Sequence, residues 1–497
     1  MTADVVRTVV VLSLAGALPS MALAGVRPVA LAVTPLSGAA IAALASTCCL
    51  AIAGDLWEWF VVLAALAAAA VLAVWAVRPG SRPWSRDAGE WSWPVLGGMA
   101  VVIAVVVWSL RGLSVPDVGF DARMLWVLRG AWFVHGHGVA RGVLTNVSYQ
   151  FAEPSFPPLI GSAAGIGWVA NGMEVGSAAS FRLGQIVVGV LNGCALVALG
   201  TAMLRVSTSA TRRTGHVPDW VAGVAAAVVA ALLCTAAAGS AGRYLTNGFA
   251  DAPWVFAAAF AVVFGLFLPV SPSNLGVAAV GVAVAGQIKL EGTFTAGAVV
   301  VLLSLRYAWA APSRRGRVAA VVAGGAGLAA LAAWPILASA LHAVPDADTT
   351  GPRSGTIDGR LHATVDAFGG HLHLVPVAAV VAIVGALVLR GSRRQLGLGS
   401  DLALWLVMAC NLVVVAGTYV FGTTTIRVWL GVSVDRVVLF AVVMALVDVA
   451  VWSLVAVDLL LSEGTRVFHR PPVPRPSGGG TPAALDGGRP GVLHQPP

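Results

Sequence analysis

Apolar runs of about 20 residues recur from one end of the chain to the other, and they restrict its fold more than any other feature. An α-helix of that length crosses the hydrocarbon core of a bilayer and satisfies its own backbone hydrogen bonds there. Of the 497 residues, 58% are hydrophobic and only 10% are charged, whereas a soluble domain has about 25% charged residues. The sequence therefore predicts an all-α, polytopic membrane protein.

About 13 transmembrane helices are predicted from these runs. They are expected at residues 5–24, 29–53, 57–77, 95–112, 182–204, 218–240, 250–268, 274–288, 293–305, 318–340, 374–390, 402–420 and 437–461. Arg-rich connections at 77–86, 211–216, 306–317 and 390–394 are assigned to the cytoplasm by the positive-inside rule. The N-terminus is then expected outside and the C-terminus inside. The apolar stretch 158–170 is short and contains three glycines, so a re-entrant or interfacial helix is expected there.

The chain divides into three predicted parts. These are N-terminal transmembrane helices at 1–94, a transmembrane module at 95–461 with outer loops 113–181 and 341–373, and a tail at 462–497. The first outer loop is expected to be partly helical, and 421–436 is expected to be a short outer segment before the last helix. The tail is rich in Pro and Gly without apolar periodicity, so it is expected to be disordered in the cytoplasm.

The charge balance and the cysteines exclude several classes of protein. The net charge of +8 comes from cations in short loops, where they act as topology determinants, so no nucleic-acid partner is expected. The five cysteines lie inside apolar runs and form neither a disulfide framework nor a zinc-binding spacing. The opening segment is similar to a signal peptide, but further apolar runs follow at once, so a retained first helix is expected.

Charged residues also lie within or beside apolar runs, where each costs roughly 3 kcal/mol at mid-bilayer and needs a reason. They are Asp121, Arg123 and Arg129 in "GFDARMLWVLRGAWF", Glu153 in "FAEPSFPPL", Asp251 in "NGFADAPWVF", Lys289 and Glu291 in "GQIKLEGTF", and Asp435 and Arg436 in "VWLGVSVDR". The predicted topology places most of them on the outer side, so one site can collect them. The alternative is that each is a helix cap or an interfacial anchor, as the position of Asp251 at a helix start suggests.

These segments together resemble the GT-C glycosyltransferases, integral membrane enzymes that take a sugar from a polyprenyl-phosphate carrier. Asp121 and the run Pro157-Pro158-Leu159 resemble the first outer loop of that family. "NGFADAPWVFAAAFA" is similar to the helix start Gly-Tyr-Ala-Asp-x-Pro of actinobacterial and other bacterial members. "IKLEGTF" is similar to their Lys-Asn-Glu-Gly, and "WLGVSVDR" to their Trp-His-Leu-x-Thr-Ser-x-Asp-Arg. The four segments match in order and spacing between residues 95 and 460.

The chain departs from the family pattern at three positions. Ser155 stands where relatives often have an acid, Glu153 where they often have His, and Trp429 where the last motif has His. A catalytically decayed member of the family is therefore an alternative interpretation.

The resemblance implies a glycosyltransferase in the plasma membrane with its active site facing outside. In the family, an aspartate of the first outer loop acts as the base or binds the acceptor, which gives that role to Asp121, with Glu153 as the second catalytic acid. Such a transfer needs a carboxylate for the acceptor proton and cations for the departing phosphate. The other residues expected to bind the substrate or its phosphate are Arg123, Arg129, Asp251, Lys289, Glu291, Asp435 and Arg436. The implied partners are a lipid-linked sugar donor, an envelope glycan, lipid or protein acceptor, and membrane lipid.

No cofactor is expected, and a divalent metal is the alternative. His135 and His137 in "VHGHG" and His371 and His373 in "GHLHL" are candidate imidazole ligands from two outer loops. The alternating spacing suits a strand or a turn, but it does not by itself bring the two pairs together.

A transporter or flippase of an envelope precursor is the alternative function. Intramembrane Asp, Lys and Arg residues serve as relays in transporters, which predicts charges near mid-bilayer and broken helices in matching halves. Nucleotide-sugar chemistry has no support, because the sequence contains no P-loop, dinucleotide fingerprint or Ser-His-Asp order.

Overall fold

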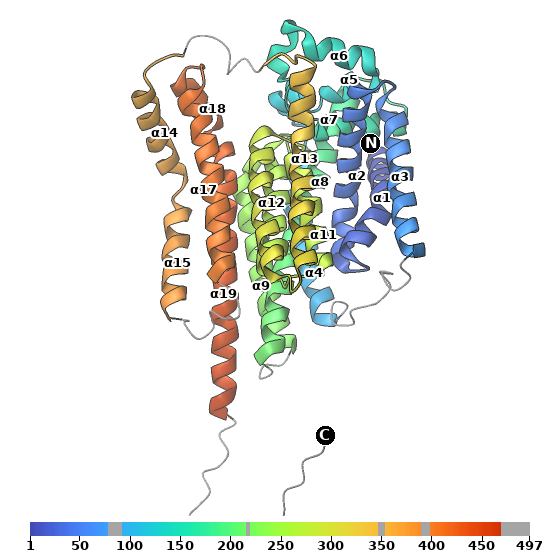
Figure 1. The fold of residues 1–497 in the computed structure, drawn as a ribbon. Helices are drawn as coiled ribbons and strands as arrows, with labels where there is room; N and C mark the ends of the chain where they lie inside the picture. The colour runs from blue at the N-terminus through green and yellow to red at the C-terminus, as the bar shows by residue number, and fades with distance from the viewer. Residues whose placement is uncertain (78–91, 215–218, 346–352, 389–397, 469–497) are drawn as a thin grey trace, which may run out of the picture.

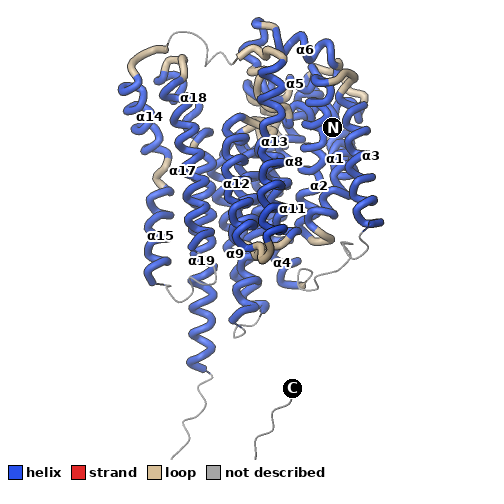
Figure 2. Tube along the Cα trace, viewed as in Figure 1, coloured by secondary structure: helices blue, strands red, loops and turns tan. Residues whose placement is uncertain are grey.

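The computed structural model describes residues 1–77, 92–214, 219–345, 353–388 and 398–468 (Figure 1). Within these ranges every regular element is helical, and no strand is present (Figure 2). The predicted all-α fold of a multi-pass membrane protein is confirmed, because the described residues form ten helices long and apolar enough to cross a membrane.

The long helices run roughly along one axis of the bundle (Figure 1). They are α1 (Thr2–Ala24), α2 (Pro28–Ala51), α3 (Leu56–Val77), α4 (Trp93–Ser109), α8 (Ala178–Thr214), α9 (Asp219–Ala241), α12 (Leu290–Ala310), α13 (Arg314–Ala340), α17 (Leu398–Phe421), and α18 (Ile426–Val437) followed by α19 (Leu439–Phe468). Shorter ones are α5 (Arg129–Val134), α6 (His137–Thr145), α7 (Leu159–Asn171), α10 (Asp251–Val262), α11 (Pro272–Gly286), α14 (Ile357–His371) and α15 (Leu374–Val388). The 3₁₀ helices are η3 (Leu110–Ser114), η5 (Val147–Ala152) and η6 (Gly242–Leu245), and the π-helices are η4 (Ala122–Trp126) and η7 (Val263–Phe267).

The predicted number of about 13 transmembrane helices is too high. Among the described residues, ten helices are long and apolar enough to cross a membrane, or eleven if a bent pair counts as one span. The expected span 250–268 is α10 with 12 residues and the five-residue η7, and the span 274–288 is α11 with 15 residues. Every residue of α10 and η7 is buried, so neighbouring protein, rather than lipid, surrounds this segment. The span 374–390 is α15, which meets α14 at a bend of 67°, so the pair counts as one further span at most.

Three boundaries differ from the prediction. In the segment 421–436, expected before the last helix, α18 begins at Ile426, and the stretch Ile426–Val457 is long and apolar enough for one span. The helix α19 extends past the predicted end at 461 to Phe468, and residues 469–497 of the predicted tail lie outside the described residues. The predicted outer loop 341–373 contains the helix α14. Of the Arg-rich connections, 390–394 and nearly all of 77–86 also lie outside the described residues.

Small residues let the N-terminal helices pack closely. A Cβ atom added at Gly38 of α2 would overlap the carbonyl of Leu12 in α1, and one added at Gly16 would overlap the carbonyl of Thr34. The buried hydroxyls of Ser20 and Ser37 form a 2.8 Å hydrogen bond across the same interface. Glycine at helix contacts is typical of membrane bundles, because backbones approach closely there.

The two ends of the bundle differ in character. The short helices α5 and α6 lie at one end, and the Arg-rich connection 306–317 between α12 and α13 lies at the other (Figure 1). The end with α5 and α6 also receives the start of α10, the end of α11 and the start of α12. The segments that carry the charged motifs therefore reach the same end of the molecule.

Candidate functional site

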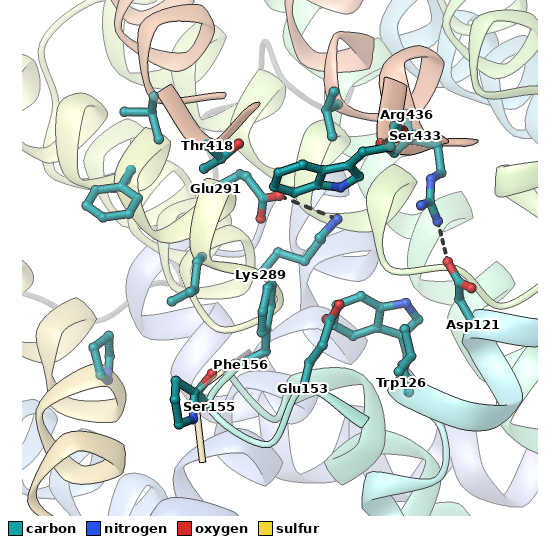
Figure 3. Close-up of a pocket in the computed structure, with 18 of the residues that line it drawn as sticks. Asp121, Trp126, Glu153, Ser155, Phe156, Lys289, Glu291, Thr418, Ser433 and Arg436 are labelled. Carbon is teal, nitrogen blue, oxygen red and sulfur yellow. Dashed lines mark hydrogen bonds and ion pairs between the residues drawn. The ribbon is translucent and has the colours of Figure 1, made fainter. Parts of the chain in front are cut away.

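A cavity of about 620 Å³ opens at this end of the bundle (Figure 3). Five charged side chains contribute to its lining: Asp121, Glu153, Lys289, Glu291 and Arg436. They come from four separate segments, namely the residue before η4, the turn after η5, the start of α12 and the end of α18. The structure thus brings together residues that are more than 300 positions apart in the chain.

Opposite charges alternate through the site. Arg436 pairs with Asp121, and its Nη1 atom lies 3.9 Å from Oδ2 of Asp251. Lys289 Nζ lies 2.9 Å from Oδ1 of Asp251 and 3.7 Å from Oε1 of Glu291. Asp251 is only 1% exposed and lies behind the cavity wall, between the two cations. A buried carboxylate placed in this way is stabilised only if its partners remain charged and close.

Local backbone structure explains why these side chains meet. Asp251 occupies the first position of α10, where the free N–H groups and the helix dipole favour a negative charge. Gly292 allows α12 to start against the end of α11, because a Cβ atom there would overlap the carbonyl of Ala285. The amide of Leu159, at the start of α7, donates a 2.9 Å hydrogen bond to the carbonyl of Gln287. The segment that carries Lys289 is thereby tied to the "EPSFPPL" turn.

Aromatic rings flank both cations of the site. The ammonium of Lys289 lies 5.5 Å from the ring centre of Trp126, and the guanidinium of Arg436 lies 5.1 Å from Phe249 and 5.9 Å from Tyr244. Burial disfavours the charged form of Lys289, but the nearby carboxylates outweigh that effect and raise its pKa above the ordinary value. Lys289 therefore stays cationic at neutral pH, and the rings restrict where both cations can move.

Asp121 is the most accessible carboxylate of this ion-pair chain. Its side chain is 26% exposed, compared with 16% for Glu291 and 1% for Asp251. Its carboxylate points toward Arg436 (Figure 3). A ligand that enters the cavity can therefore contact Asp121 and Arg436, whereas Asp251 supports the cations from behind.

Arg129 is not placed to bind a ligand in the cavity. It is 2% exposed, and its guanidinium donates hydrogen bonds to the carbonyls of Ala152 and Phe156, both at 2.9 Å, and to the carbonyl of Glu153. Glu153 has a left-handed backbone with φ of 46°, which is unfavourable for a residue other than glycine. Arg129 therefore holds the turn that carries Glu153 into the cavity.

Replacing Arg129 with Met is expected to lower the free energy of unfolding by about 3 kcal/mol, because buried carbonyls lose charged donors. Thermal unfolding in detergent micelles measures this loss. Arg123 lies in the same segment, is exposed and does not line the cavity, so Arg123→Met is the matched control. Equal melting temperatures for the two variants would contradict this role of Arg129.

Two other predicted residues also lie outside the cavity. Arg123 is exposed on the segment 122–126. Asp435 is exposed as well, and one of its oxygens accepts a 2.7 Å hydrogen bond from the Tyr244 hydroxyl. Arg436, the next residue of α18, lines the cavity, whereas Asp435 does not.

The other part of the cavity is apolar and was not anticipated from the sequence. Its lining includes Phe294 of α12, Pro335 and Ala338 of α13, Val414 of α17, and Trp429 and Val432 of α18. Tyr419 of α17 also lines it, and its hydroxyl forms a 2.6 Å hydrogen bond with Ser433. In the sequence these residues look like ordinary membrane-helix residues, and only the packing of four helices shows that they share a cavity.

The candidate histidine ligands do not form a metal site in the described part of the chain. There, no three His, Cys, Asp or Glu side chains are arranged so that they could hold a metal ion. His137 instead places Nδ1 at 2.7 Å from the carbonyl of Cys49.

The chain matches no known family model, no curated protein and no solved structure. The chemistry of the cavity is therefore the basis for a functional proposal.

Proposed function

We propose that the chain is a GT-C-type glycosyltransferase that moves a sugar from a polyprenyl-phosphate carrier to a cell-envelope acceptor. The observation that carries this proposal is a cavity with a charged part and an apolar part, set between membrane helices. A lipid-linked sugar phosphate has the same division, because its phosphate and sugar are polar and its carrier chain is apolar. We place the site at the outer face of the plasma membrane, since the Arg-rich connection 306–317 lies at the opposite end.

The two cations of the cavity are suited to the phosphate. Arg436 presents a guanidinium, which binds phosphate oxygens in a bidentate manner, and Lys289 adds a second positive charge. In the structure, Arg436 is paired with Asp121. A phosphate that binds Arg436 would compete with this ion pair and free the Asp121 carboxylate.

Asp121 is then the general base. Its carboxylate accepts the proton of the acceptor hydroxyl while the acceptor oxygen forms a bond to the anomeric carbon of the sugar. The bond between that carbon and the phosphate oxygen breaks, and polyprenyl phosphate leaves as an anion stabilised by Arg436 and Lys289. Glu153 and Glu291 line the same cavity and are placed to bind sugar or acceptor hydroxyls. Asp251 acts indirectly, because it holds both cations.

The apolar lining provides room for the first part of the carrier chain. Phe294, Pro335 and Val414 come from α12, α13 and α17, three helices that the structure brings around one space. Branched hydrocarbon and apolar side chains gain contact energy when they pack, although lipid offers much of the same environment. The carrier would therefore be selected mainly by its phosphate and oriented by this lining.

A transporter or flippase would use the charged residues as a relay across the bilayer. The charges that line the cavity instead lie at one end of the bundle, which favours chemistry at the membrane surface. A catalytically decayed family member would retain the cavity but not turn over the donor.

Binding of the donor's lipid phosphate tests the proposed site. Polyprenyl phosphate is expected to raise the melting temperature of the wild-type protein in micelles, whereas the uncharged polyprenol should not, because Arg436 recognises the phosphate. Arg436→Gln should bind at least tenfold more weakly, and Arg123→Gln, which changes an arginine outside the cavity, should bind like the wild type. Stabilisation by polyprenol equal to that by polyprenyl phosphate would contradict the proposal.

A further inference from the structure

A second group of acidic residues lies far from the cavity, where α17 and α19 pack together. Asp401 belongs to the first turn of α17, and Asp448 is the tenth of the 30 residues of α19. Asp448 lies 12 residues beyond Arg436, which corresponds to about 18 Å along a helix. Asp401 lies 18 residues before Tyr419, about 27 Å along α17. The two carboxyl groups are neighbours in the interface between α17 and α19, away from the cavity.

Asp448 is fully buried, and it lacks the partners that a buried carboxylate needs. Its relative exposure is 0%, and neither of its oxygens forms a hydrogen bond within ordinary geometric limits. The carboxyl of Asp401 and the indoles of Trp405 and Trp452 are its polar neighbours. The indole N–H of Trp452 is itself buried without a partner, as is Oδ1 of Asp401. Buried polar atoms of both helices thus lie in the interface between them.

The cations nearest to this pair have other partners in the described part of the chain. None of the ion pairs there includes Asp401 or Asp448. Of the helices packed against α19, α15 has no charged residue and α10 has only Asp251, which lies at the cavity end. On α8, Arg205 lies over the ring of Phe264 at 5.5 Å and has interactions of its own. On α9, the thiol of Cys234 donates to a carbonyl of α8. On α12, which packs against α17, the guanidinium of Arg306 donates to the carbonyls of Gly265 and Leu268.

We propose that Asp401 and Asp448 form a proton-binding site in which one carboxyl is protonated and donates a hydrogen bond to the other. Two neighbouring carboxyl groups in a buried apolar interface resist ionisation of both, because burial disfavours each charge and the two charges repel. A single shared proton removes one charge and supplies the missing donor, and the indole N–H groups stabilise the remaining charge. The pair then joins α17 to α19.

This site has a consequence for the cavity, because the same two helices lead to it. The segment α17 carries Tyr419, and α18, which continues into α19, carries Arg436. Loss of the proton places two negative charges between α17 and α19, and their repulsion separates the helices at this contact. Proton occupancy of this pair thereby influences the helix packing that shapes the cavity.

The pH dependence of unfolding tests the proton site. An unfolded aspartate loses its proton above about pH 4, whereas the folded pair retains one, so the folded state should lose stability as pH rises. Between pH 5 and 8 the unfolding equilibrium constant of the wild type should rise up to about tenfold per pH unit relative to Asp448→Asn. The amide of Asn can donate to Asp401 at every pH, so this variant retains the contact. Parallel pH profiles for the two proteins would overturn the proposal.

Chemical modification provides a second measurement. A membrane-permeant carbodiimide reacts with protonated carboxyl groups, so it should modify Asp401 or Asp448 at pH 7 in the wild type. Asp358, whose side chain is 83% exposed, should remain unmodified and serves as an internal control. Sodium ions at constant ionic strength should not change the result. Protection by sodium would mean that the pair binds a metal cation, and would overturn the assignment of a proton.

Discussion

Replacing Asp121 with Asn is expected to lower the rate of sugar transfer at least about 100-fold, the usual lower range for loss of a general base. Asn has nearly the same shape as Asp but cannot accept the acceptor proton. The fold should tolerate this change, because Asp121 is partly exposed and Arg436 keeps Asp251 as a partner. The measurement is the initial rate of transfer from a polyprenyl-phosphate sugar in membranes with matched amounts of folded protein.

Asp117 provides the matched control for this variant. It lies four residues before Asp121, is exposed and does not line the cavity. Asp117→Asn should therefore transfer sugar at the wild-type rate. If Asp121→Asn retained the same rate as Asp117→Asn, Asp121 would have no catalytic role, and the enzyme would need another base.

Replacing Lys289 with Met is expected to destabilise the protein by about 3–5 kcal/mol, the usual cost of leaving a buried charge without its partner. Lys289 is 8% exposed, and it supplies the closest positive charge to Asp251, at 2.9 Å. Arg436 lies 1.0 Å further from that carboxylate, so it compensates only part of the loss. The free energy of unfolding in detergent micelles, measured with a denaturant, gives the size of the effect.

A second substitution separates this electrostatic cost from a loss of packing. The double variant Lys289→Met with Asp251→Asn has neither buried charge, so most of the lost stability should return. If the double variant were as unstable as the sum of the two single variants, the ion pair would not be the cause. Transfer activity should remain low in the double variant, since Lys289 is also a proposed phosphate ligand.

The apolar runs were sufficient to predict where the helices lie, but not how many of them are long enough to span the membrane. Their length and composition gave nearly every long helix within a few residues, because a bilayer requires both properties. The short pair α10 and α11 has the same composition, and only burial inside the bundle distinguishes it from a lipid-facing span. The continuation of α18 into α19 was missed because Asp435 and Arg436 interrupt the apolar pattern.

The location of the candidate site was predictable from the sequence, but the ion pairs within it were not. Alternation of the predicted helices placed Asp121, Lys289 and Arg436 on one side, which agrees with their shared cavity. Which cation faces which carboxylate depends on side-chain direction and helix packing, and neither property is visible in the sequence. Arg129 illustrates the limit: in the sequence it resembles a phosphate ligand, yet its guanidinium is occupied by backbone carbonyls of the next turn.

The fate of a radiolabelled lipid-linked sugar tests the central claim most directly. Membranes that contain the wild-type protein are supplied with sugars on polyprenyl phosphate and with envelope acceptors, and both the label and the released polyprenyl phosphate are measured. A glycosyltransferase moves the label to the acceptor and releases one polyprenyl phosphate for each sugar transferred, and this reaction should be lost in Asp121→Asn. Recovery of the intact donor on the opposite leaflet, without release of polyprenyl phosphate, would contradict the proposed function and identify a flippase.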